Sequence, residues 1–400
     1  MMKYWDKIQF FVLLILLALT ALSSHPNVTR MSRDAGMANG TFLSVFVIAV
    51  FALLVLLCYR SLFRLKIQRK CWLLLFFILV AYLGTYVFFD SSTMLGDVRA
   101  IGICLCGIAI GVHLKMDEKN YRFLLLYFAG LITFVGLMQV LQGVGGFVIK
   151  DQYIRDNKNS LGVELSTAII LYLILGISNK KKLFYKIVAF SLAILTFVIL
   201  LTIRARSSTL ATLLIVMYFV YVTYKNNYKK NYALRIIGLL FVLGIVIVLL
   251  PETFGDYIYN SFYQNHEEDL SSGRFDRNRA AIQFLKRNPY FGNLMAQETL
   301  LWIHNYPLLK LFENGIFFSI PIFILYLYIL VFTIRRSFVK NMTLRSVGFT
   351  VLIIPYMISL SEPTFPFGPG TATVMNYILF GVALRDSYIK KNKNEITTNI

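Results

Sequence analysis

The sequence has few charged residues: only 15% of its 400 residues are Asp, Glu, Lys or Arg, whereas 58% are apolar. A soluble domain of this length needs far more polar surface, so the composition predicts a membrane protein. Cysteine is also scarce, and Cys58, Cys71, Cys104 and Cys106 all lie in or beside apolar runs. Because Cys104 and Cys106 are too close in sequence for a usual zinc pair, we expect neither a disulfide framework nor a metal site.

Acidic residues are the scarcer of the two charge types. The chain has 20 Asp and Glu against 40 Lys and Arg, which gives a formal net charge of +20. In a soluble protein this excess would suggest nucleic acid as a partner. In a membrane protein, basic residues gather in cytoplasmic loops and meet anionic lipid. We therefore expect membrane lipids, and no nucleic acid, as partners.

Apolar windows of about 17–25 residues predict spanning helices, because the hydrocarbon core is about 30 Å thick. The predicted fold class is an all-α polytopic membrane protein with about twelve transmembrane helices. Of these windows, 98–114 and 160–178 are the least apolar. The windows are 8–23, 41–59, 71–89, 98–114, 121–142, 160–178, 183–203, 207–224, 233–250, 306–334, 344–360 and 371–388.

Basic residues favour one orientation. Most of the 40 Lys and Arg lie in alternate short loops that an N-in, C-in topology places inside. The outer loops 90–97 and 361–370 contain no Lys or Arg. The chain then divides into four parts. Transmembrane helices 1–9 occupy residues 1–250, an extracytoplasmic loop 251–304, transmembrane helices 10–12 residues 305–388, and a polar cytoplasmic tail 389–400, which we expect to be disordered.

The 251–304 loop contains the predicted amphipathic helix. Ser272 is a candidate N-cap, and Pro289 limits the helix at its other end. At helical spacing, Phe275, Ile282 and Leu285 share one face, while Arg274 and Arg277 share another. This pattern indicates a helix on the membrane surface that presents arginines either to lipid headgroups or to an anionic ligand.

A second group of basic residues lies on the outside, against the orientation rule. Arg204 and Arg206 occupy a short turn between two strongly apolar helices. Arginines there are costly unless they reach the interface or are paired. The turn is either an interfacial anchor or an anion site, because the guanidinium fork matches phosphate oxygens.

Of the four histidines, only His304 is expected both outside and at a helix entrance, that of the 306–334 helix, beside the predicted amphipathic helix. Imidazole titrates near neutrality and can take a proton from a hydroxyl group. Lys310 and Glu313, three residues apart in the same helix, can pair and support that helix. Other candidates for the general base are His25, His266, Glu298 and the acidic stretch 267–269.

Three ordered stretches carry a resemblance to a known family, and a fourth, Lys158-Asn-Ser-Leu-Gly162, fits its style. The three are Arg204-Ala-Arg206-Ser-Ser-Thr-Leu-Ala, Ser272-Gly-Arg274 followed by Asn288-Pro-Tyr-Phe-Gly292, and His304-Asn305 followed by Leu311-Phe-Glu-Asn-Gly315. Their order around a large outer loop resembles the O-antigen polymerase and O-antigen ligase superfamily, over about residues 155–320.

The resemblance implies transfer of a glycan from an undecaprenyl diphosphate carrier at the outer face of a bacterial cytoplasmic (inner) membrane, without cofactor or metal. It implies His304, Arg206 and Arg274 as catalytic residues. It also implies diphosphate binding by Arg204, Arg206, Arg274, Arg277 and Arg279, with Asn305, Lys310 and Glu313 in support. Partners would be the carrier-linked oligosaccharide, a chain-length regulator and a flippase.

Alternatives remain open at this point. A polymerase of O-antigen, capsular polysaccharide or exopolysaccharide is favoured, because the sequence matches the shared motifs only loosely. A ligase that builds lipopolysaccharide by transfer to a lipid A core is the first alternative. A flippase or other transporter is disfavoured, because transporters place polar groups near the midplane of several spans. A metal-dependent glycosyltransferase is disfavoured because the first outer loop offers only Asp34 as an acid.

Overall fold

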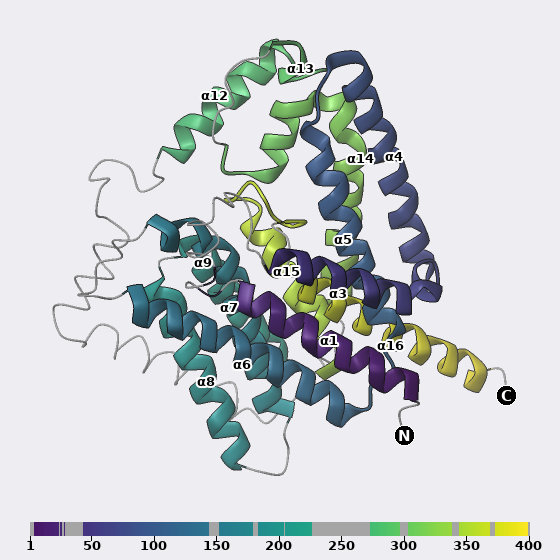
Figure 1. Ribbon diagram of the computed structural model, residues 1–400, viewed down its shortest axis with the longest axis vertical. Coiled ribbons are helices and arrows are strands. Elements are labelled where there is room, and N and C mark those ends of the chain that lie inside the picture. The colour runs from purple at the N-terminus through teal and green to yellow at the C-terminus, as the bar shows by residue number, and fades with distance from the viewer. Residues whose placement is uncertain are drawn as a thin grey trace.

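The computed structural model describes residues 4–23, 25, 28, 43–143, 152–178, 183–203, 205–225, 273–296, 303–337, 344–368 and 373–398. Every regular element in these ranges is helical (Figure 1), which confirms the all-α part of the predicted fold class. The main helices are α1 (Tyr4–Ser23), α3 (Ser44–Leu57), α4 (Lys66–Phe89), α5 (Thr93–His113), α6 (Glu118–Gly143), α7 (Gln152–Ser178), α8 (Leu183–Thr202), α9 (Arg206–Lys225), α12 (Arg274–Arg287), α13 (Asn293–Ala296), α14 (Tyr306–Ser337), α15 (Val347–Ile358) and α16 (Val374–Thr398). Short 3-10 turns, η1 (Tyr59–Ser61) and η2 (Leu344–Ser346), precede α4 and α15.

Seven of the described helices, α1, α4, α5, α6, α7, α8 and α14, are long and apolar enough to cross a membrane. Shorter apolar helices cover Ser44–Leu57 and Leu344–Ile358. These helices make the chain a multi-pass membrane protein. The predicted window 233–250 lies outside the described residues, so the count of twelve spans and the orientation stay predictions.

The two least apolar windows form the centre of the bundle. In α7, 83% of the best spanning window is buried inside the protein, and in α5 56% is buried, against 11% in α4. Side chains of α5 and α7 therefore face other helices more than lipid. Polar residues are tolerated there when they find partners, as when Thr167 donates to Asn376 of α16 at 3.0 Å.

Small residues allow α5 and α16 to pack backbone to backbone. A Cβ atom at Gly111 would meet the carbonyl oxygen of Ile378 and would lie 2.9 Å from Gly381 Cα. A Cβ atom at Gly381 would in turn meet the carbonyl oxygen of Ile108. Close approach of this kind is how helices associate in membranes, where dispersion contacts replace the hydrophobic effect.

Helix α14 is two helices joined at a break, which corrects the prediction of one continuous span over 306–334. Gly315 has φ 66° and ψ −177°, a conformation that glycine adopts far more easily than other residues. Beyond the break, the backbone N–H groups of Ile316 and Phe317 donate to Pro289 and Tyr290 at 3.0 and 3.2 Å. The turn after α12 thus replaces the hydrogen bonds that the break removes. We call residues 306–314 the half-helix.

The last helix continues further than predicted. Helix α16 runs to Thr398, so the expectation of a disordered tail is wrong for most of residues 389–400. No Gly or Pro interrupts that stretch, and each added residue of an existing helix gains a hydrogen bond without a new nucleation cost.

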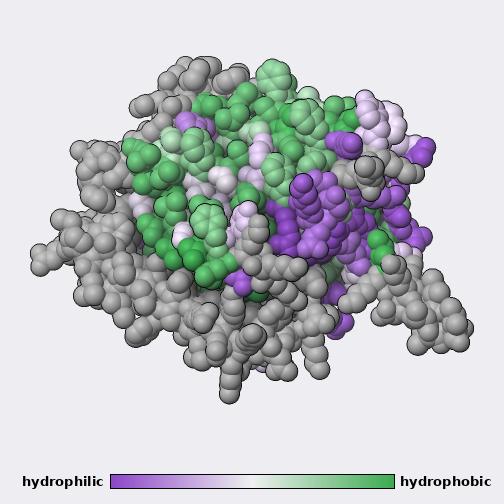
Figure 2. Space-filling model, turned by 90° about the horizontal axis from the view of Figure 1, so that it is seen from below, coloured by the Kyte–Doolittle hydropathy of each residue, from purple (hydrophilic) through white to green (hydrophobic). Residues whose placement is uncertain are grey.

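Hydrophilic and hydrophobic side chains gather in different parts of the surface. Figure 1 shows α12 and α13 together at one end of the molecule, beside the start of α14. Figure 2, seen from below, shows hydrophilic side chains gathered on one side of the face, next to broad hydrophobic surface. Large apolar side chains such as Phe76, Phe88 and Phe46 are exposed on α4 and α3, as expected for surface that contacts lipid.

Candidate functional site

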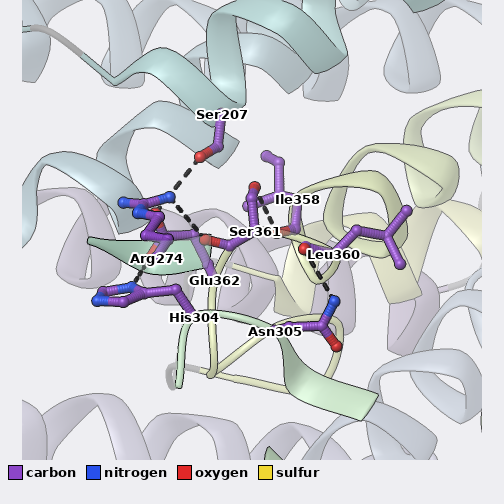
Figure 3. A network of polar contacts seen from close by, with 8 residues as sticks. All are labelled: Ser207, Arg274, His304, Asn305, Ile358, Leu360, Ser361 and Glu362. Carbon is purple, nitrogen blue, oxygen red and sulfur yellow. Dashed lines mark hydrogen bonds and ion pairs between the residues drawn. The ribbon is translucent and has the colours of Figure 1, made fainter. Parts of the chain in front are cut away.

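A buried carboxylate, Glu362, lies where three helices begin (Figure 3). Glu362 follows α15 and its side chain is only 4% exposed. Arg274 Nη2, from the first residue of α12, donates to its Oε1 at 3.0 Å, and Ser207 Oγ, at the start of α9, donates to the same oxygen at 3.4 Å. His304 Nδ1, just before α14, lies 3.6 Å from Oε2. Glu362 therefore gathers residues that are far apart in the sequence.

The carbonyl groups just before Glu362 extend this contact. They belong to the C-terminal end of α15, where helix carbonyls lack partners and the helix dipole is negative. Three donors occupy them: the Tyr306 backbone N–H bonds to Ser359 at 2.8 Å, Asn305 Nδ2 to Leu360 at 3.0 Å, and Arg274 Nη1 to Ser361 at 2.8 Å. The guanidinium of Arg274 thus meets both a carboxylate and a helix C-terminus, each of which attracts a cation.

His304 is held by the residue that follows it. Asn305 caps the half-helix, because its Oδ1 accepts the backbone N–H of Leu308 at 2.9 Å. His304 is 20% exposed, and its Nδ1 has no hydrogen-bond partner among the described residues. At 3.6 Å the approach to Glu362 is too long for a hydrogen bond. A carboxylate on that side nevertheless favours the tautomer with the proton on Nδ1, which leaves a lone pair on Nε2.

Close packing against α7 fixes the start of α9. A Cβ atom at Gly162 would lie 2.5 Å from Ser208 Oγ and 2.8 Å from Ala205 Cβ. Ser166 Oγ adds a 3.3 Å hydrogen bond to the Ser208 carbonyl. The stretch that ends at Gly162 and the stretch that begins at Arg204 are therefore neighbours in space. Arg206 is the first residue of α9 and is half-buried, while Arg204 lies outside the described residues.

Helix α12 packs on the half-helix with one face. Its buried residues are Ala281 and Phe284, and Phe284 packs on Phe312 of the half-helix with ring centroids 4.7 Å apart. Phe275 and Ile282, predicted to face the membrane, are exposed at 74% and 47%, so their contact with the membrane stays a prediction. The buried face of α12 is therefore the one that contacts the half-helix. The N-cap of α12 is Gly273, which has no side-chain cap bond, and the predicted cap, Ser272, lies outside the described residues.

The remaining predicted arginines are also on α12. Arg277 is half-buried and Arg279 is exposed, and neither forms an ion pair within the described part of the chain. Helix α12 ends at Arg287, before Pro289, as predicted.

Below His304, the predicted pair of Lys310 and Glu313 is confirmed, with 2.6 Å between Lys310 Nζ and Glu313 Oε2. Sequence reasoning missed its third member. Asp97 of α5 lies 2.9 Å from Lys310 Nζ, in a close ion pair that lacks hydrogen-bond geometry on the Asp97 oxygen. No spacing rule links residues that are this far apart in the chain.

The structure thus brings Arg274 and His304 to one carboxylate, and Ser207, the neighbour of Arg206, donates to the same oxygen as Arg274. Glu362 itself was missed. Its signal was a single acid in a predicted outer loop without basic residues. Among the rival bases, His25 lies in a described position after α1, whereas His266, Glu298 and the stretch 267–269 are outside the described residues.

Comparison with known proteins bears on this region. A family model described as O-antigen ligase matches residues 191–293. The match covers most of α8, all of α9 and α12, and therefore includes Arg206 and Arg274 but not His304 or Glu362. It confirms the resemblance to the O-antigen polymerase and O-antigen ligase superfamily, a glycosyltransferase-like enzyme family. No curated protein matches the chain.

Proposed function

We propose that this protein polymerises oligosaccharide repeat units linked to undecaprenyl diphosphate, at the outer face of a bacterial cytoplasmic membrane. The observation that carries the proposal is the meeting of Ser207, Arg274 and His304 at Glu362. Two of these residues lie inside the stretch that matches the O-antigen ligase family. The product would be O-antigen or a capsular or exopolysaccharide.

The reaction makes two demands on the protein. The bond between the donor sugar and the diphosphate breaks, and its electron pair leaves with the diphosphate oxygen, whose growing negative charge needs stabilisation. The acceptor hydroxyl loses its proton as its oxygen bonds to the donor sugar carbon. Because the donor carries its own activated leaving group, a side-chain base and cationic side chains meet both demands without a metal.

Arginines meet the first demand. Arg204, Arg206, Arg277 and Arg279 would bind the diphosphate by charge-assisted hydrogen bonds. Arg274 differs from them, because both of its terminal nitrogens already have partners in Ser361 and Glu362. We propose that Arg274 completes the diphosphate site by its charge and fixes the start of α12, with its guanidinium oriented in advance.

His304 meets the second demand. Glu362 beside Nδ1 orients the imidazole, so that Nε2 accepts the proton of the acceptor hydroxyl. Glu362 also stabilises the imidazolium ion that results. Oε1 of Glu362 already accepts hydrogen bonds from Arg274 and Ser207, and the carboxylate is only 4% exposed, so the 20% exposed His304 is more accessible to an acceptor hydroxyl.

A ligase that transfers finished polymer to a lipid A core is the second candidate function. The description of the matching family favours it, and both reactions use the same donor and the same groups. The two differ in the acceptor, which the described residues do not identify. In either case we propose an N-in, C-in topology, which places the start of α9 and the end of α15 outside.

Deletion of the gene and analysis of the surface glycan by gel electrophoresis test the proposal. We expect a polymerase deletion to leave single repeat units on the acceptor. A ligase deletion would leave bare acceptor and carrier-linked polymer, and a flippase deletion would leave the repeat units inside the cell. Complementation with His304→Ala or Arg206→Ala should not restore polymer, although the protein inserts. Unchanged chain length in the deletion strain would refute the proposed polymerase.

A further inference from the structure

The cluster of Asp97, Lys310 and Glu313 contains more carboxylates than its own charge balance needs. Lys310 and Glu313 already pair within the half-helix at 2.6 Å. Asp97 adds a second negative charge to a single ammonium group, and the side chains of Lys310 and Asp97 are only 8% and 10% exposed. Burying a further carboxylate is costly, and apolar replacements of buried ion pairs are often neutral or stabilising. Asp97 therefore needs an explanation other than the balance of charge.

What Asp97 adds is a connection between helices. One of its oxygens accepts the hydroxyl of Tyr306 at 3.3 Å, and the other is 2.9 Å from Lys310 Nζ. Tyr306 and Lys310 lie one turn apart on the half-helix, and Lys310 Nζ also lies 5.6 Å from the centre of the Tyr306 ring. A single side chain of α5 thus holds the half-helix at two successive turns.

A second contact joins the same two elements at the other end of the half-helix. Thr93, the first residue of α5, donates to Asn314 Oδ1 at 3.0 Å. Asn314 is fully buried, directly before the break at Gly315. Polar side chains of α5 therefore fix the half-helix at both ends, and the break lets it take an orientation that the rest of α14 does not dictate.

His304 lies at the start of the half-helix that Asp97 holds. Tyr306 follows it by two residues, and the backbone N–H of Tyr306 donates to Ser359 at 2.8 Å, in the segment that leads to Glu362. Any shift of the half-helix relative to α5 moves His304 relative to Glu362. We propose that Asp97 is a positioning residue for His304. It holds the half-helix in the position, relative to α5, in which the imidazole lies beside Glu362 and can reach the acceptor hydroxyl.

This inference rests on the proposed function, and an assay of glycan transfer by the purified protein tests it. The probe is carrier-linked repeat unit purified from the deletion strain, given to the full-length protein in detergent, with kcat, KM and thermal unfolding measured. For Asp97→Asn we expect kcat to fall about 10-fold to 100-fold, because displacements near 1 Å at a reacting group cost that much. The KM for the donor should change little, since Asp97 touches no proposed diphosphate ligand.

Asp97→Glu separates position from charge. It keeps the carboxylate but lengthens the side chain, so a positioning residue loses kcat in this variant too, whereas a residue needed only for its charge regains it. Asp386→Asn is the matched control. Asp386, in the middle of α16, forms an ion pair with Arg345 of η2 at 3.0 Å, and its loss should leave kcat unchanged.

Three results would overturn the inference: wild-type kcat in Asp97→Asn, full kcat in Asp97→Glu, or a change confined to the amount or thermal stability of folded protein. The proposed function fails separately. If the wild-type protein does not extend the purified repeat units, or His304→Ala is as active as wild type, the polymerase itself is refuted.

Discussion

Removing Arg274 should cost more free energy of unfolding than neutralising Glu362, and the difference can be measured. Removing Arg274 leaves a carboxylate that is 4% exposed with only the Ser207 hydroxyl, 3.4 Å away, as a hydrogen-bond donor. Loss of one partner of a buried pair costs about 3–5 kcal/mol. Because the Arg274 side chain is 31% exposed, water can fill its place, and we expect about 2–3 kcal/mol for Arg274→Ala.

The reverse change should cost less. In Glu362→Gln, the guanidinium keeps its 2.8 Å bond to the Ser361 carbonyl and its access to water. We expect about 1 kcal/mol, near the value of an ordinary hydrogen bond. The double variant Arg274→Ala with Glu362→Gln contains no unpaired buried charge. It should therefore be more stable than Arg274→Ala alone by about 1 kcal/mol, a coupling that double-mutant cycles resolve.

Activity should not follow stability in this cycle. If Arg274 helps to neutralise the leaving diphosphate, both variants that lack it lose polymer formation, including the double variant whose stability recovers. Thermal unfolding of the purified protein and glycan gels of the complemented strain supply the two readouts. Glu118→Gln is the control, since its pair with Arg122 at 2.7 Å involves a 66% exposed carboxylate and should be worth little. Recovery of polymer in the double variant would mean that Arg274 acts only as the counter-ion of Glu362.

Three further predictions concern the backbone and the chemistry. Gly315→Ala should prevent stable folding, because residue 315 has φ 66° and its Cβ would meet the Tyr290 carbonyl oxygen; normal yield and activity would contradict this. Gly111→Ala should lower the thermal unfolding midpoint, since the methyl group would meet the Ile378 carbonyl oxygen and separate α5 from α16; an unchanged midpoint would show that the helices can move apart at no cost. Transfer of purified repeat units should persist in EDTA, and its loss with recovery on adding a divalent cation would indicate metal-dependent chemistry.

Most helices were predictable because their signal is local. Long apolar runs such as 71–89 and 183–203 match α4 and α8 closely. The least apolar windows, which became α5 and α7, are weak for a physical reason. They are the most buried of the compared spans, so their surroundings are protein, and hydrogen-bonded polar side chains replace lipid-facing apolar ones.

The site was predictable only in part, because its organiser is a tertiary feature. Arg274 and His304 carry sequence signals, since each lies at the edge of a recognisable helix outside the expected inner loops. Glu362 has no helical periodicity and lies 58 positions beyond His304, and only the fold brings the two together. The break after the half-helix has a sequence signal, because Asn314-Gly315 is a dipeptide that favours turns. The long apolar run around it favoured one continuous helix instead.

The charges around Glu362 suggest why the outer arginines are divided between two tasks. Arg274 is paired at rest, so it adds little net positive charge to the site but provides a guanidinium that needs no reorganisation. Arg277 and Arg279 form no ion pair within the described residues, and we propose that their charge attracts the diphosphate. A site in which every arginine were unpaired would repel itself before substrate arrived, and one in which every arginine were paired would have no field to attract an anion. The buried glutamate allows a cation to be held close to the histidine without raising the positive potential on the imidazole that must accept a proton.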